Sequence, residues 1–306
     1  MSGGILQAAG PVAGRIADLG WLLLGGGALI FLFVMVLLAL ALRQRRGRMQ
    51  PLVWVLGGGV LFPAVVLSAL FFWALPLAPV ARQAPPPGAL HITVTGRMWW
   101  WELRYAAEGA HGEFLAANEV RIPVGRPVWL ALAADDVIHS FWVPQLAGKI
   151  DMVPGRMQHL LLEADRPGIY RGQCAEFCGE QHARMALQVV ALPPADFESW
   201  RQAQLLPAPQ AVTPLQQRGQ QVFLAKRCDA CHTVRGITGD AQLGPDLTHV
   251  GSRLQIGAGT LANSPQALAQ WIAHVQDIKH GARMPSYDRL DAASLDALAH
   301  WLGSLQ

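Results

Sequence analysis

Two long, uncharged apolar runs constrain the fold of this chain more than any other feature. They occupy residues 19–42 and roughly 52–75, and each is long enough to cross a hydrocarbon core of about 30 Å. Hydrophobic residues make up 52% of the chain and charged residues only 15%, and these runs hold much of the apolar excess. Two such runs in succession argue against soluble core helices. The pattern predicts a transmembrane helical hairpin over residues 19–80, preceded by an external tail of residues 1–18.

Basic residues indicate the orientation of this hairpin. A cleaved signal peptide is the alternative for the first run, but that run is too long and ends at arginines rather than at small residues. The loop carries Arg43, Arg45, Arg46 and Arg48, which the positive-inside rule places in the cytoplasm. The body of the chain would then lie outside the cell. The net charge of +3, without a basic patch interleaved with aromatic residues, gives no indication of nucleic-acid binding.

Short strand-like runs follow a Pro-rich connector at Pro76 to Gly88. Between Leu90 and Leu192, segments such as His91–Thr95 and Ala186–Ala191 are rich in β-branched residues and are separated by Gly, Pro and Asp. Regularly spaced short strands without intervening helices are typical of a β-sandwich or a Greek-key barrel. Residues 81–192 are therefore expected to form an all-β domain with rigid loops at its ends.

A stretch of twelve residues in this domain contains four soft or borderline-soft metal ligands: Cys174, Cys178, His182 and Met185. A mononuclear blue-copper site needs one Cys, two His and a weak Met, so the second Cys favours two metal ions bridged by two thiolates. The spacing would also suit one face of a helix, but nearby glycines and flanking strand-like segments favour a loop. His139 is the best candidate for the missing histidine. A disulfide between the two cysteines is the alternative, and it leaves the histidine and methionine spacing unexplained.

A second cofactor motif lies near the carboxyl end, at Cys228-Asp-Ala-Cys231-His232. This is the attachment motif of c-type haem, in which two thiols form thioethers and the histidine binds the iron. Half a zinc site or a redox dithiol is the alternative, but no further Cys follows for a complete zinc site. Cytochromes c use His/Met ligation, and Met284 is the only Met after His232. Bis-histidine ligation would instead use one of the other histidines, His249, His274, His280 or His300.

The region around the haem motif has a helical pattern. Residues 193–214 contain several prolines and are expected to be a linker before a helical domain at 215–306. Leu215 to Arg227 is predicted to form one helix. Ser264 and Pro265 suit the N-cap and first turn of a second, through about Val275. Asp291 is expected to cap a last helix, whose apolar residues recur at helical spacing.

Together these motifs resemble cytochrome c oxidase subunit II with a fused class I cytochrome c domain, over nearly the whole chain. The resemblance rests on Cys-x-Glu-x-Cys-Gly-x-x-His-x-x-Met, on His-Ser-Phe-Trp-Val-Pro, and on Met-Pro-Ser-Tyr after the haem motif. It implies a cupredoxin fold for the all-β domain, and a haem-domain core in which Gly219 and Phe223 cross Trp301. A loop with the sequence Gly-Pro-Asp-Leu-Thr, ending at His249, resembles one whose proline carbonyl orients the proximal histidine.

The resemblance also implies roles for individual residues. Dinuclear copper A would be bound by His139, Cys174, Cys178, His182, Met185 and the backbone carbonyl of Glu176. The Glu176 side chain would reach a magnesium ion at the contact with subunit I. Trp99 matches the indole that receives electrons, whereas a core or membrane-interface role is the alternative for its neighbours Trp100 and Trp101. Asp151 would lie on the face that docks cytochrome c, with a solvated turn carboxylate as the alternative.

The function implied is electron transfer within a terminal haem–copper oxidase. The chain would be a multi-pass protein of the bacterial inner membrane, with its copper and haem domains on the periplasmic side. Electrons from a cytochrome c or a quinol–cytochrome c reductase would pass through covalent haem c (held by Cys228, Cys231, His232 and Met284) and then Trp99 and copper A. They would continue to subunit I, where oxygen is reduced, in a complex that also holds subunit III. A copper chaperone or storage protein with an appended cytochrome is the alternative.

Overall fold

The computed structural model describes residues 7–43, 50–75, 84–109 and 112–306. The chain divides into two compact units. One comprises residues 14–84, and the other comprises residues up to 13 together with 85–306. Three of the four loop arginines, Arg45, Arg46 and Arg48, lie outside the described residues, as does most of the Pro-rich connector.

The first unit consists of two apolar helical stretches. The first is α1 (Pro11–Arg43), and the second runs through α2 (Pro51–Val53), a π-helical stretch η1 (Trp54–Leu61) and α3 (Phe62–Ala74). Each stretch is long and apolar enough to cross a membrane, which fits the predicted hairpin. Because α1 begins at Pro11, the last part of the expected tail at 1–18 is helical, and proline suits a first helical turn.

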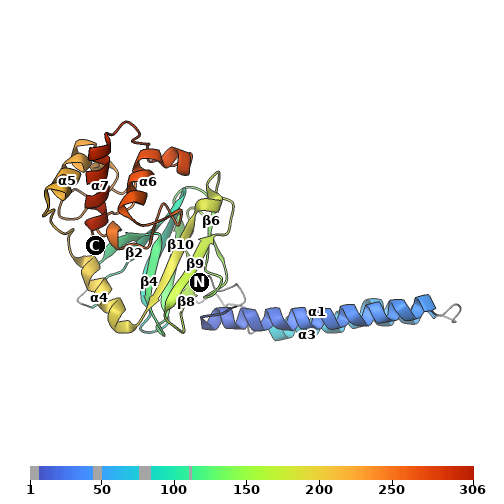
Figure 1. The fold of residues 1–306 in the computed structure, drawn as a ribbon. Helices are drawn as coiled ribbons and strands as arrows, with labels where there is room; N and C mark the ends of the chain where they lie inside the picture. The colour runs from blue at the N-terminus through green and yellow to red at the C-terminus, as the bar shows by residue number, and fades with distance from the viewer. Residues whose placement is uncertain (1–6, 44–49, 76–83, 110–111) are drawn as a thin grey trace. The chain divides into compact units, whose positions relative to one another are not determined.

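Two five-stranded sheets form the sandwich of the second unit (Figure 1). One sheet has the order β3-β2-β1-β5-β8 and the other β4-β10-β9-β6-β7. Only the pairs β1/β5 and β4/β10 are parallel. The strands of the first sheet are β1 (Leu90–Arg97), β2 (Trp100–Tyr105), β3 (Phe114–Ala117), β5 (Val128–Ala134) and β8 (Gln158–Leu162). Those of the second are β4 (Glu119–Pro123), β6 (His139–Trp142), β7 (Ile150–Met152), β9 (Gly168–Cys174) and β10 (Ala186–Leu192).

The core of the sandwich follows from the alternation of side chains along its strands. In β1, every second residue from Leu90 is buried, and in β2 Trp101, Leu103 and Tyr105 are fully buried. The all-β, cupredoxin-like architecture is therefore confirmed. Strands β3, β6 and β7 were not anticipated, because runs of three or four residues are too short to show a period of two.

The segment expected to be a linker, residues 193–214, contains a helix. Helix α4 (Pro194–Leu205) packs Phe197 and Trp200 against the sandwich, where the Trp200 ring meets that of Tyr105 edge-on. The buried Arg201 guanidinium pairs with Glu108 at 2.6 Å. Prolines at positions 193 and 194 start this helix rather than prevent it, since proline is tolerated in a first turn. Only a short stretch after Leu205 connects α4 to the haem-motif region.

Three helices surround the haem motif (Figure 1). They are α5 (Pro214–Ala225), α6 (Pro265–Ile278) and α7 (Ala292–Ser304), with short 3-10 turns η4 (Cys228–Ala230) and η5 (Val250–Ser252) and a two-stranded ribbon of β11 (Gln255–Ile256) and β12 (Leu261–Ala262). The side chains of Ser264 and Asp291 cap α6 and α7 as predicted.

The predicted crossing of α5 and α7 is confirmed. A methyl group at Gly219 would lie 2.2 Å from the Ala297 carbonyl oxygen, so the two backbones approach too closely for any side chain. One turn further along α5, the Phe223 ring meets Trp301 edge-on, with ring centroids 5.2 Å apart. The helical class I cytochrome c architecture is thus present in the part of the chain that follows the sandwich.

Candidate functional site

The cysteine-rich segment is a loop that connects β9 to β10. It contains one short 3-10 turn, η3 (His182–Arg184), and the Cys174 amide donates to the Met185 carbonyl at 2.9 Å to close it. The segment is therefore a loop, as predicted, and not a continuous helix. Gly179, at φ +110°, adopts a backbone conformation that side chains disfavour. The loop folds back on itself, which brings its ends together instead of spreading them along a helix face.

The five predicted copper-binding side chains converge on one buried point. The ligand atoms of His139, Cys174 and Cys178 all lie within 4.8 Å of one another. The two sulfur atoms are 3.8 Å apart, and the Cys178 sulfur is 3.6 Å from His182 Nδ1 and 3.8 Å from the Met185 sulfur. No disulfide joins the two thiols.

Glu176 meets this cluster through its backbone. The Cys174 thiol donates to the Glu176 carbonyl oxygen at 3.2 Å, which places that oxygen beside the sulfur pair. The donors are therefore two thiols, two imidazoles, a thioether and a carbonyl. This is a soft set that suits copper.

His139 reaches the cluster from a separate strand, β6. Its Nε2 lies 2.8 Å from the Asp136 carboxylate, so its Nδ1 faces Cys174 at 3.9 Å. Asp136 was not anticipated from the sequence, although a carboxylate three residues before a ligand histidine is a recognisable signal. The imidazole also packs against Gly96, where a methyl group would lie 2.8 Å from the ring. Only glycine leaves room for the ring in this position.

The two thiols differ in acidity because they share a site. The hydrogen bond between the two thiols lowers the pKa of Cys174 to about 3. The same hydrogen bond, together with burial, raises the pKa of Cys178 far above its ordinary value. One thiolate therefore forms readily, whereas the second needs bound cations to compensate its charge. Two copper ions would supply that compensation, so the residues fit a dinuclear centre.

Glu176 of the cysteine-rich loop and Asp151 of β7 both have exposed carboxylates, which a single lysine joins. Lys149 Nζ bridges the two carboxylates, at 2.7 Å from Asp151 and 3.4 Å from Glu176. The side chains of Glu176 and Asp151 are 44% and 50% exposed. Both carboxylates are available to a partner or an ion. Binding one would break only a surface ion pair with Lys149, which contributes little to stability.

Trp99 stands between the sulfur cluster and the haem-motif region. Its Nε1 donates to the Cys178 carbonyl at 2.8 Å. Its ring lies next to both Gly179 and Gly281, where added methyl groups would approach it to 3.2 and 3.4 Å. The indole therefore contacts both the cysteine loop and the segment that precedes Met284.

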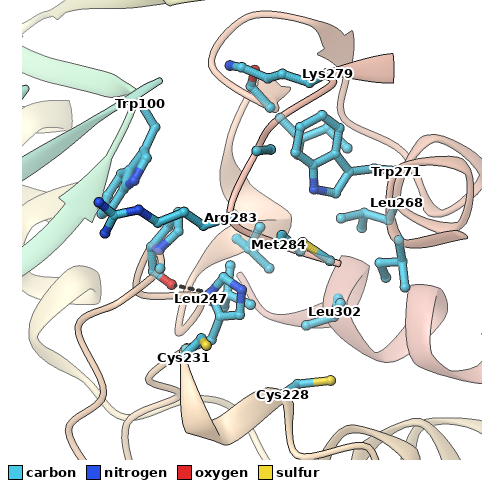
Figure 2. A pocket seen from close by; sticks show the side chains of 18 of the residues that line it. Trp100, Cys228, Cys231, Leu247, Leu268, Trp271, Lys279, Arg283, Met284 and Leu302 are labelled. Atoms are coloured by element: carbon cyan, nitrogen blue, oxygen red, sulfur yellow. Dashed lines mark hydrogen bonds between the residues drawn. The ribbon is translucent and has the colours of Figure 1, made fainter. Parts of the chain in front are cut away.

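A cavity of about 330 Å³ opens beside the haem motif, within the range of about 300 to 1,000 Å³ typical of cofactor sites. Cys228, Cys231, His232 and Met284 line it, and Figure 2 shows the two cysteines and Met284 around the same space. His232 Nδ1 donates to the Pro245 carbonyl at 2.8 Å, which leaves Nε2 for iron. Burial lowers the pKa of His232, so its ring is a neutral ligand. The residues fit a covalently bound haem.

The alternative axial histidines are engaged elsewhere. His249 Nε2 donates to the Leu206 carbonyl at 3.1 Å. His274, His280 and His300 pair with Asp277, Glu180 and the Asp296 carbonyl at 3.5, 2.9 and 2.9 Å. None of the four lines the cavity. Met98, which lies between β1 and β2 of the sandwich, also lines the cavity, so the cavity is built from both parts of this unit.

Comparisons with known proteins match the two regions of the chain that hold these sites. Residues 106–192 match the family model of the cytochrome C oxidase subunit II periplasmic domain, and residues 216–306 match that of cytochrome c. A cytochrome c oxidase subunit 2 from Alkalihalophilus pseudofirmus is 42% identical over 230 residues, covering 74% of this chain and 65% of the relative. That from Bacillus sp. (strain PS3) is 30% identical over 226 residues, covering 70% and 62%. This chain thus spans slightly less than two thirds of each of these relatives.

Among solved structures, the periplasmic domain of subunit II of cytochrome oxidase from Bradyrhizobium japonicum is 30% identical. The match covers 39% of this chain and 95% of that one, with a TM-score of 0.37. Fold and sites together define a membrane protein with an external domain, in which a cupredoxin-like sandwich precedes a c-type cytochrome. In sequence the chain is similar to cytochrome c oxidase subunit II, in a form that carries a cytochrome c domain after the subunit II domain.

Proposed function

We propose that this chain is the electron-transfer subunit of a terminal cytochrome c oxidase, accepting electrons at its cytochrome c domain and delivering them through its sandwich to subunit I. The observation that carries the proposal is the position of Trp99. Its indole hydrogen-bonds the Cys178 carbonyl and lies against Gly281, close to the haem cavity. When bound, a haem c and a dinuclear copper centre supply two one-electron redox couples at these sites.

The residues around the two sites have distinct tasks in this proposal. Cys228 and Cys231 would attach the haem, and His232 and Met284 would bind its iron. His139, Cys174, Cys178, His182, Met185 and the Glu176 carbonyl hold the copper pair. Asp136 orients His139, and the Pro245 carbonyl orients His232. The buried loop would keep its two thiols in place, which favours fast electron transfer by a bound copper pair.

The proposed surroundings follow from the two apolar helices and the exposed carboxylates. The chain is anchored in the bacterial inner membrane, and its metal domains face the periplasm. The Glu176 carboxylate takes part in a magnesium site at the contact with subunit I, and subunit III belongs to the same complex. A cytochrome c or a quinol–cytochrome c reductase donates the electrons. Asp151 contributes to a docking face for that donor.

Electron paramagnetic resonance on the purified, haem- and copper-loaded chain tests the copper assignment. We expect one unpaired electron shared over two equivalent coppers, with two coppers and one haem per chain by metal analysis. A single ordinary Cu(II) signal, or no signal at full copper occupancy, would contradict the assignment. The chain would then be better described as a copper-handling protein with an appended cytochrome, whose copper exchanges with chelators.

A further inference from the structure

Lys279 is an ionisable residue buried between the two metal-site regions, and neither site uses it. It follows α6 directly and is only 3% exposed. Its Nζ donates to three backbone carbonyls, those of Trp99 and Arg184 at 2.7 Å and that of Gly257 at 3.0 Å. In the part of the chain that the structure describes, no carboxylate pairs with it. Lysine is rarely buried without such a partner.

The three acceptors match an ammonium group. An ammonium has three N–H donors and no acceptor, so each donor has one carbonyl here. Burial lowers the pKa of Lys279 to about 7, and the neighbouring Arg184 opposes its charge. Three carbonyls satisfy the ammonium form, at a desolvation cost that an apolar residue of similar length would avoid. Simple packing at this position would not require a lysine.

The three carbonyls belong to segments that matter for both sites. Trp99 donates from its indole nitrogen to the cysteine loop, and its six-membered ring lies next to Gly281. Arg184 directly precedes Met185, the predicted thioether ligand. The Arg184 carbonyl is therefore part of the peptide bond that joins these two residues. Gly257 lines the haem cavity and packs against Trp271, where a methyl group would lie 2.6 Å from the ring. Figure 2 shows Lys279 at the rim of this cavity, near Trp271.

We propose that Lys279 is a positioning residue for electron transfer between the two sites. It ties the Trp99 backbone, the peptide before Met185 and the wall of the haem cavity to one ammonium group. Other contacts join the same two regions independently, such as Arg121 Nη2 to the Ser252 carbonyl at 2.9 Å and the Leu254 amide to Glu119 at 2.8 Å. Loss of the ammonium should therefore loosen Trp99 without separating the regions. The inference rests on the proposed electron-transfer function.

The test is Lys279→Met in the intact chain, loaded with haem and copper. Photoreduction of the haem, followed by its reoxidation and the reduction of the copper centre, gives the internal transfer rate. We expect this rate to fall at least about tenfold, since small displacements of a reacting group have effects of this size. Haem and copper contents, both spectra and the rate of haem reduction by an external reductant should stay at wild-type values.

His280→Gln is the matched control, because it alters the neighbouring residue. His280 makes an exposed ion pair with Glu180 between the same regions, with side chains 73% and 58% exposed. Its internal transfer rate should remain within about twofold of wild type, as exposed pairs contribute little. A slowed His280→Gln variant would mean that any change at this junction slows transfer, and would overturn a specific role for Lys279.

Lys279→Gln is the second variant if Lys279→Met does not load its metals. An amide keeps two of the three donors without the charge, so we expect a rate between those of wild type and an apolar variant. Wild-type transfer in a loaded Lys279→Met or Lys279→Gln variant would overturn the proposal and leave Lys279 as a packing residue. No haem-to-copper transfer in the wild-type chain would overturn the proposed function itself, and the positioning role with it.

Discussion

At the scale of single residues, the two sites depend on atoms that orient the ligands as much as on the ligands. His139 presents Nδ1 to Cys174 because Asp136 takes its Nε2, and His232 keeps Nε2 free because Pro245 takes its Nδ1. The thiol pair is polarised in the same way, since a hydrogen bond makes one cysteine strongly acidic and the other weakly acidic. Such orientation is what lets a soft ligand set select its metal.

Cys178→Ser tests whether the sulfur pair binds two coppers. A hydroxyl is a poor ligand for copper and cannot replace a bridging thiolate, so we expect the copper content to fall from two per chain to one or none. The shared-electron resonance signal should disappear. Haem content should be unchanged, because Cys228 and Cys231 serve the other site. Retention of two coppers with the original signal would show that Cys178 does not bridge them.

His249 gives the cytochrome domain a predictable response to acid. Burial lowers the pKa of His249 below its ordinary value of about 6.5. The unfolded chain therefore binds a proton that the folded chain does not, once the pH falls below about 6.5. The free energy of unfolding should decrease in this range by up to about 1.4 kcal/mol per pH unit, until the folded histidine also becomes protonated.

Calorimetry of wild type and His249→Gln from pH 7.5 to 5 measures this contribution. Glutamine can still donate to the Leu206 carbonyl but does not titrate, so the variant should lose less stability between these pH values than wild type. Equal losses in the two proteins would show that His249 is not the group responsible. The haem-loaded chain is used throughout, so that ligation is the same in both.

At the scale of secondary-structure elements, close backbone approaches determine where the site residues lie. The α5–α7 crossing depends on Gly219, and the position of His139 depends on Gly96. Both glycines have ordinary backbone angles, so it is space rather than conformation that requires them. The loop between β9 and β10 shows the second use of glycine, because Gly179 has a positive φ and also contacts Trp99.

Gly219→Ala should destabilise the cytochrome domain. The added methyl group would lie 2.2 Å from the Ala297 oxygen and 2.6 Å from the Trp301 Cβ, so α5 and α7 must move apart. Overpacking of this kind costs about 1 to 3 kcal/mol. Gly239→Ala is the control, because a methyl group there meets nothing within 4 Å. Denaturant unfolding followed by haem absorbance gives both values, and equal stability of the two variants would contradict the close contact.

At the scale of the whole molecule, the unit outside the apolar helices joins two metal-site regions by polar contacts. The Glu119 carboxylate pairs with Arg121 at 2.7 Å and accepts from the Leu254 amide, and it is 8% exposed. The Ala186 amide donates to the Ala258 carbonyl at 3.0 Å. These contacts keep the haem cavity beside Trp99. The short stretch of chain between α4 and α5 also tethers the cytochrome domain to the sandwich. Such a tether raises the effective concentration of one domain near the other to roughly the millimolar range.

Glu119→Ala tests this junction. A site for a specific protease is inserted after Ala211, and washed membranes carrying the cut chain are sedimented. Removing a buried, charge-assisted acceptor weakens such a contact by about 1.5 to 3 kcal/mol, so more haem should appear in the supernatant of the variant than of wild type. Glu180→Ala is the control, because it removes only the exposed ion pair with His280. This variant should release no more haem than wild type. Equal release from all three chains would show that Glu119 does not hold the regions together.

The sequence by itself determined the parts of this protein whose signals are local. Apolar runs, the Cys-x-x-Cys-His motif, the cysteine loop and the helix caps at Ser264 and Asp291 depend on neighbours along the chain, and each was readable there. The short strands β3, β6 and β7 were not readable, because runs of three or four residues do not show a period of two. Prolines suggested a linker at 193–214, whereas packing of Phe197 and Trp200 on the sandwich favours a helix.

Only the tertiary structure decided which distant groups meet. Trp99 came into contact with the Gly179 and Gly281 segments, and Lys279 was enclosed by carbonyls from three segments. A lysine after a helix is ordinarily solvated, and nothing in its local sequence indicates burial. The physical reason is that ligand identity is a property of side-chain chemistry, which the sequence states directly. Orientation and desolvation are properties of the surroundings, which exist only once the chain has folded.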